Sequence, residues 1–189
     1  ILDDVKRNGD EAVKTYTEKF DGVSVSGLRV EPGAFRDAYD QMEPQARDAL
    51  EKAADRIKRF SMKQLEQLTG FEMEIEPGVF SGQRVLPLER VGVYVPGGNF
   101  PLVSSLLMGA VPARTAGVKE IAVCTPPRKD GSIDQGILAA AYIVGVDELY
   151  AAGGVQAVGA LAFGTETIKK VDKIVGPGNQ YVTAAKKEV

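Results

Sequence analysis

The chain has 189 residues, of which 44% are hydrophobic and 26% are charged, and these proportions are ordinary for a globular protein with a buried core. A net charge of −3 and the lack of any apolar run near ~20 residues lead us to expect neither nucleic acid nor a membrane as partner. The single cysteine, Cys124, excludes an internal disulfide and is typical of a cytoplasmic protein.

The sequence contains no histidine, which excludes a histidine-based triad and imidazole metal ligands within these residues. It begins with Ile1, and its last predicted helix runs to Val189 without a capping glycine or proline. We therefore expect a portion of a longer polypeptide, and we expect any chemistry that needs histidine to lie in the rest of it.

Residues 1–80 are rich in charge and predict a helical N-terminal segment. A helix over 1–8 should end at Gly9, and Asp10 is a plausible N-cap for a second helix over 11–20. A long helix is predicted over 44–68, and a strand over 71–76 before a Pro77-Gly78 turn. The long helix has one apolar face, which consists of Ala46, Leu50, Ala53, Ile57 and Phe60. That face must pack on something and offers a surface for a partner.

Residues 81–189 hold most of the 21 glycines and alternate regularly between strands and helices. Strands are predicted over 91–95, 120–124, 148–151 and 173–175, and helices over 102–116, 135–144, 156–163 and 180–189. Four strand–helix units in series predict an α/β domain with a parallel sheet, right-handed crossovers and helices on its faces. We thus expect two parts: a helical segment over 1–80 and an α/β domain over 81–189.

All turns that follow the strands should lie on one edge of this sheet, where ligands bind in open α/β folds. Glycines there let the backbone approach a ligand closely, and helix N-termini point N–H groups at the same space. The four turns are Pro96-Gly97-Gly98, Thr125-Pro126-Pro127, Gly153-Gly154 and Gly176-Pro177-Gly178.

Three polar residues in or beside these turns are the best candidates for ligand contact: Tyr94, Gln156 and Asn179. Each can form hydrogen bonds without carrying charge, although strand packing for Tyr94 and helix capping or turn stabilisation for the two amides would explain them equally well. Other chemistry is disfavoured, because neither G-x-G-x-x-G nor a Walker A motif occurs. Cys124 and Ser104-Ser105 have no activating base and fit packing roles.

Several long blocks of the sequence resemble the histidinol dehydrogenase family. They are RVGVYVPGG (90–98), KEIAVCTPP (119–127), GGVQA (153–157), ALAFGTE (160–166) and VDKIVGPGN (171–179), with GDEA (9–12) and FDG (20–22) near the start. The resemblance covers essentially the whole chain. It implies an incomplete Rossmann-like sheet of the aldehyde-dehydrogenase-like fold for residues 81–189, preceded by the helical segment.

The resemblance also implies a function. Members of the family are zinc-dependent homodimers that oxidise L-histidinol to L-histidine through the aldehyde, with two NAD+, in histidine biosynthesis. Their NAD-contacting positions match Tyr94, Gln156 and Asn179. Their zinc ligands and acid/base residues match nothing here and are expected beyond Val189. We therefore predict no catalytic or metal-binding residue in this chain and no turnover by the chain alone.

Two alternatives remain at this point. Ser61 and Asn99-Phe100 depart from the family pattern, and paralogues of the family oxidise other small polar alcohols, so a zinc- and NAD-dependent polyol dehydrogenase, for example one acting on sulfopropanediol, fits the same residues. A catalytically idle α/β module that binds a nucleotide or a protein partner is the other alternative.

Overall fold

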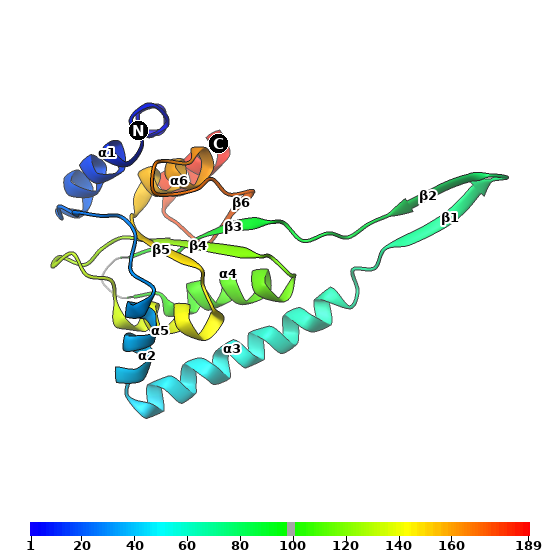
Figure 1. The fold of residues 1–189 in the computed structure, drawn as a ribbon, viewed down its shortest axis with the longest axis horizontal. Helices are drawn as coiled ribbons and strands as arrows, with labels where there is room; N and C mark the ends of the chain where they lie inside the picture. Colours follow the sequence, from blue (N-terminus) through cyan, green and yellow to red (C-terminus); the bar gives the residue numbers. More distant parts are fainter. Residues whose placement is uncertain (98–100) are drawn as a thin grey trace.

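The fold is built on a four-stranded parallel sheet (Figure 1). The computed structural model describes residues 1–97 and 101–189. The sheet consists of β3 (Arg90–Tyr94), β4 (Glu120–Thr125), β5 (Glu148–Ala151) and β6 (Lys173–Val175), in the order β5-β4-β3-β6. All three strand pairs are parallel, as the alternating pattern of the sequence predicts. β3 is buried along its whole length, because helices cover both faces of the sheet.

The helices that connect the strands lie on opposite faces of the sheet. α4 (Val103–Thr115) and α5 (Gln135–Val144) pack on one face, whereas α6 (Gly154–Phe163) and α7 (Gln180–Glu188) lie on the other. α5 begins where the Asp134 carboxylate accepts a hydrogen bond from the Gly136 N–H, and it ends at Gly145, whose φ of 73° is left-handed.

Three N-terminal helices extend these layers. α1 (Leu2–Asp21) packs on α6, α2 (Gly33–Gln41) on α5, and α3 (Pro44–Leu65) on α4. The N-terminal helices thus share their packing with the sheet domain. A domain boundary near residue 80 stays a prediction. Among the helices of residues 1–97 and 101–189, none combines the length and apolar character that a membrane crossing requires.

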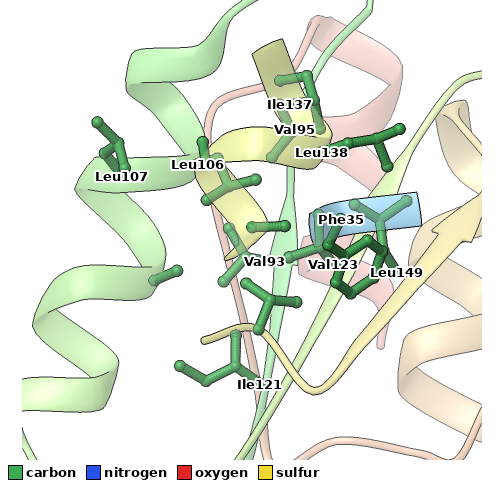
Figure 2. Packing of buried hydrophobic residues seen from close by; sticks show 14 of the residues in the cluster. Phe35, Val93, Val95, Leu106, Leu107, Ile121, Val123, Ile137, Leu138 and Leu149 are labelled. Atoms are coloured by element: carbon green, nitrogen blue, oxygen red, sulfur yellow. The ribbon is translucent and has the colours of Figure 1, made fainter. Parts of the chain in front are cut away.

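The larger of two apolar cores fills the space between the sheet and helices α2, α4 and α5 (Figure 2). β-Branched side chains of the strands, such as Val93 and Val123, meet Leu106 of α4, Ile137 of α5 and Phe35 of α2. The second core lies between the sheet and helices α1, α6 and α7. Together the two cores hold the carboxyl edge of the sheet in place.

A two-stranded hairpin projects away from this body (Figure 1). β1 (Phe71–Glu76) pairs antiparallel with β2 (Val79–Gln83) around the Pro77-Gly78 turn, where Gly78 has a φ of 80°. Every residue of both strands is exposed. The strand predicted over 71–76 is confirmed, whereas β2 was not predicted.

The N-terminal predictions need four corrections. α1 does break at Gly9 (φ 51°), but Asp10 is not the cap of the second half: its carboxylate accepts hydrogen bonds from the backbone and hydroxyl of Thr167. α3 ends at Leu65 rather than 68. Leu50, Ala53 and Ile57 of the predicted face pack against the core beside the buried Ala54, whereas Ala46 is exposed and Phe60 is 68% exposed, so both lie outside the packed face. α2 was not predicted.

Candidate functional site

The carboxyl edge of the sheet brings the predicted glycine turns together, as far as the structure describes them. In the turn after β3, Gly98 lies outside the described residues, as do Asn99 and Phe100. A Cβ atom on Gly97 would overlap Pro126, and one on Gly153 would lie 2.6 Å from the Pro126 side chain. Pro126, which follows β4, is therefore wedged between the turns after β3 and β5. This close packing requires glycine at both positions.

Tyr94 closes β3 and is only 4% exposed. Its hydroxyl oxygen accepts a hydrogen bond of 3.1 Å from the backbone N–H of Gly154. The phenol thereby satisfies one of the free N–H groups at the start of α6. Burial raises the pKa of Tyr94, so the hydroxyl stays protonated at neutral pH.

Gln156 lies in the first turn of α6 and is 1% exposed. A Cβ on Gly154 would lie 2.8 Å from the Gln156 Oε1 atom, which shows that the amide folds back over the Gly153-Gly154 turn. Within residues 1–97 and 101–189, this Oε1 atom has no hydrogen-bond partner. A buried acceptor without a donor costs about 1–3 kcal/mol, so it calls for an explanation.

Asn179 is exposed and opens α7. Its Oδ1 atom accepts hydrogen bonds of 3.0 Å from the backbone N–H groups of Tyr181 and Val182. Asn179 is therefore an N-cap, one of the two interpretations that the sequence allowed. Because the cap uses Oδ1, a ligand contact would fall to the Nδ2 amino group.

The last glycine turn lies against the end of β3. Gly176 has a φ of 116°, and a Cβ at this position would overlap the carbonyl oxygen of Tyr94. The structure thus brings Tyr94 and Gln156 together around Gly154 and places Asn179 on the adjoining turn. Sequence reasoning missed Lys186, whose ammonium donates a hydrogen bond to the Gly176 carbonyl. No sequence pattern singles out Lys186, because a lysine in the last turn of a helix is usually explained by its favourable interaction with the helix dipole.

Neither nucleophile candidate is activated. The Cys124 thiol is fully buried, and burial raises its pKa to about 12, so it packs as a small apolar side chain. Ser105 is buried within α4. Across the described part of the chain, no group of three or more cysteine or acidic side chains is arranged to hold a metal ion.

Comparison with known proteins identifies the family. The model of the family described as "Histidinol dehydrogenase" matches residues 1–189. The chain belongs to the histidinol dehydrogenase family. Curated histidinol dehydrogenases are similar over the whole chain, with 48% identity for that of Methanosarcina barkeri and 49% for that of Lactiplantibacillus plantarum. The chain spans 43% and 44% of these relatives.

A solved structure of the family confirms the fold class. The crystal structure of histidinol dehydrogenase from Elizabethkingia anophelis matches with a TM-score of 0.92 and 42% sequence identity. The match covers 99% of this chain and 43% of that one. The α/β architecture, with N-terminal helices before a parallel sheet, is thus that of a histidinol dehydrogenase over somewhat less than half of its length.

Proposed function

We propose that this chain is the NAD-binding portion of an enzyme that oxidises L-histidinol to L-histidine through the aldehyde, with two NAD+. The observation that carries the proposal is the group formed by Tyr94, Gly154 and Gln156 at the carboxyl edge of the sheet. Membership of the histidinol dehydrogenase family supports the reaction, and an enzyme of histidine biosynthesis is expected to work in the cytoplasm.

The chemistry of the edge fits a dinucleotide. NAD carries hydroxyl and carboxamide donors, and the buried Oε1 of Gln156 is an acceptor that needs one. The Nδ2 group of Asn179 can donate to an oxygen of the same ligand. At Gly97, Gly153 and Gly176 a Cβ would collide with neighbouring atoms, so glycine lets these turns pack closely at the carboxyl edge.

The nicotinamide ring of bound NAD+ supplies the hydride acceptor for each oxidation. The residues of this chain would hold and orient the cofactor. Tyr94 fixes the start of α6, the Oε1 atom of Gln156 accepts a hydrogen bond from NAD, and the Nδ2 group of Asn179 donates one to it. Zinc does not fit the described residues, because no three cysteine or acidic side chains among them are grouped so that they could hold a metal ion. The family resemblance assigns the zinc ligands and the acid/base pair to residues beyond this chain. We therefore infer that the chain alone binds cofactor without turning over histidinol.

Replacing Gln156 by leucine tests the proposed cofactor site. Leucine fills a similar volume and removes the unpaired Oε1, so the unfolding temperature of the complete polypeptide should stay the same or rise. Loss of the acceptor should weaken NAD+ binding about tenfold, as measured by calorimetric titration. The exposed Gln45→Leu is the matched control and should change neither quantity. If Gln156→Leu keeps wild-type NAD+ affinity, Gln156 is not a cofactor contact.

The nature of the substrate needs a separate experiment. NADH formation by the complete, zinc-loaded polypeptide should be compared with L-histidinol and with sulfopropanediol as substrates. We expect turnover with L-histidinol. A preference for sulfopropanediol would assign the chain to a paralogous polyol dehydrogenase, and turnover of neither substrate would favour an idle nucleotide-binding module.

We also propose that the complete protein is a homodimer in which a second copy covers the hairpin. The resemblance to the family implies a dimer. On β1, Phe71 and Met73 alternate with acidic residues, so these two apolar side chains share one face, and Ile75 lies at the register shift between Glu74 and Glu76. All three are more than half exposed. An isolated two-stranded hairpin is only marginally stable in water, which supports the idea that a partner holds this one.

A further inference from the structure

Lys186 makes a contact that its position in the sequence does not explain. It lies in the last turn of α7, and its side chain reaches back along the helix to donate a hydrogen bond to the Gly176 carbonyl. The residue is half-buried, and burial lowers its pKa. Of the ion pairs shown within residues 1–97 and 101–189, none includes Lys186.

This arrangement has a cost in free energy. A lysine ammonium is normally solvated or paired with a carboxylate, and partial burial beside a single carbonyl replaces only some of its hydration. The neighbouring Lys187 shows the usual alternative, because it lies exposed in the same helical turn. Lys186 bears this desolvation cost and Lys187 does not, which indicates a specific role for Lys186.

The carbonyl that Lys186 holds belongs to the turn at the candidate cofactor site. Gly176 crosses the end of β3 against the Tyr94 carbonyl, and Asn179 follows three residues later as the cap of α7. Two glycines, Gly176 and Gly178, give this turn many accessible conformations in the absence of other contacts. The hydrogen bond from Lys186 removes part of that freedom.

We propose that Lys186 is a positioning residue of the cofactor site, which holds the Gly176 carbonyl and so fixes the direction of the Asn179 amide. This inference rests on the proposed function. Two contacts order the segment that leads into α7 in the absence of a ligand. Asn179 accepts hydrogen bonds from the first N–H groups of the helix, and Lys186 donates one to the Gly176 carbonyl. A turn ordered in advance costs less conformational entropy on binding, which increases affinity.

The test uses Lys186→Met, Lys186→Arg and the matched control Lys187→Met in the complete polypeptide, with NAD+ as the titrant. Lys186→Met should weaken NAD+ binding about tenfold, the effect of losing one hydrogen bond from a charged donor. Lys187→Met removes the same charge from the same helical turn and should leave affinity within about twofold. Lys186→Arg should recover most of the affinity, because a guanidinium can donate to the same carbonyl.

Steady-state kinetics and salt separate positioning from other roles. Lys186→Met should raise the KM for NAD+ while kcat at saturating NAD+ changes little, the pattern of lost uniform binding. The tenfold loss should persist at high salt, since a hydrogen bond within the fold is little screened. Unfolding temperatures are measured in parallel, and Lys186→Gln replaces Lys186→Met as the test variant if the methionine variant does not fold.

Three results would overturn the inference. Unchanged NAD+ affinity in Lys186→Met, with or without a lower unfolding temperature, would make the contact structural only. Equal losses in Lys186→Met and Lys187→Met, or a loss that disappears at high salt, would indicate general attraction to the anionic cofactor. Failure of the wild-type protein to bind NAD+ would remove the proposed function itself, and the titration of the wild type distinguishes that case from the other two.

Discussion

Asn179 offers two polar groups, and the fold uses one of them. Its Oδ1 atom accepts from two backbone N–H groups at the start of α7, while its amino group takes no part in the cap. Aspartate has the same oxygen acceptors but no amino group, and it caps helices as well as asparagine does. Substitutions at this one position can therefore separate stability from ligand binding.

We expect Asn179→Ala to lower the unfolding free energy by about 1 kcal/mol, because the cap is lost. We expect Asn179→Asp to keep wild-type stability, helped by the favourable interaction of a carboxylate with the helix N-terminus. Both variants should bind NAD+ more weakly by about 1–3 kcal/mol, since both lack the amide donor. Thermal unfolding and NAD+ titration measure the two effects. Wild-type affinity in Asn179→Asp would show that Asn179 is a cap and nothing more.

At the scale of the elements, one buried arginine joins the starts of three strands. Arg90 opens β3, and its guanidinium donates to Glu120 at the start of β4 and to Glu148 at the start of β5. The Tyr150 hydroxyl donates 2.7 Å to the same Glu148 carboxylate. Burial alone would raise the pKa of Glu148, but the hydrogen bonds from Arg90 and Tyr150 outweigh it and hold that pKa below its usual value.

A lowered pKa in the folded state makes this network sensitive to acid. The stabilisation from the Glu148 carboxylate is complete above its unfolded pKa and is lost as pH falls through its folded pKa. Glu148→Gln should cost about 2–3 kcal/mol at pH 7, because it leaves Arg90 short of one partner, and the difference from wild type should shrink towards pH 3. Denaturant unfolding across that pH range measures it.

Glu120→Gln is the control for the same arginine. The Glu120 side chain is 49% exposed, whereas that of Glu148 is 11% exposed, so solvent screens the Glu120 pair. Its loss should cost less than about 1 kcal/mol at pH 7. If Glu120→Gln and Glu148→Gln lowered the unfolding free energy equally, the buried pair of Arg90 with Glu148 would not be the stronger part of the network.

The β1–β2 hairpin projects from the rest of the chain, and every residue of its two strands is exposed. Phe71→Ser with Met73→Ser removes apolar surface from one face of β1 and should shift the complete protein from dimer towards monomer, as measured by analytical ultracentrifugation. Glu72→Ser with Glu74→Ser changes the opposite face of the same strand and is the control. An unchanged dimer fraction in the Phe71 and Met73 variant would show that the second copy binds elsewhere.

For the whole molecule, the sequence predicts the sheet domain better than the N-terminal helices. Each strand of the sheet is followed by glycine or proline and then by a helical pattern, so local signals and burial agree. All four predicted strands begin and end within one residue of those observed. α2 has no such agreement. It begins at Gly33 with no side-chain cap, and its packing on α5 stabilises it.

Contacts between distant segments explain the other errors. The Asp10 side chain has the composition of a cap, yet Thr167, far along the chain, takes its carboxylate. Phe60 follows the apolar spacing of α3, but the side of α3 that faces α4 is centred on other residues. The sequence likewise places Tyr94 and Gln156 at one edge, while their nearly complete burial and the unpaired Oε1 depend on how α6 packs.

The strand order has a consequence for folding. β3, β4 and β5 follow one another in the chain and pair as neighbours, whereas β6 comes last and pairs back with β3. Closing that longer loop costs more chain entropy, and contacts between distant segments form late. We expect β6 and α7 to dock last and to open first in native-state hydrogen exchange. The turn that carries Asn179 lies between them, so the proposed NAD+ site would be complete only at the end of folding. NAD+ bound there would slow the first step of unfolding.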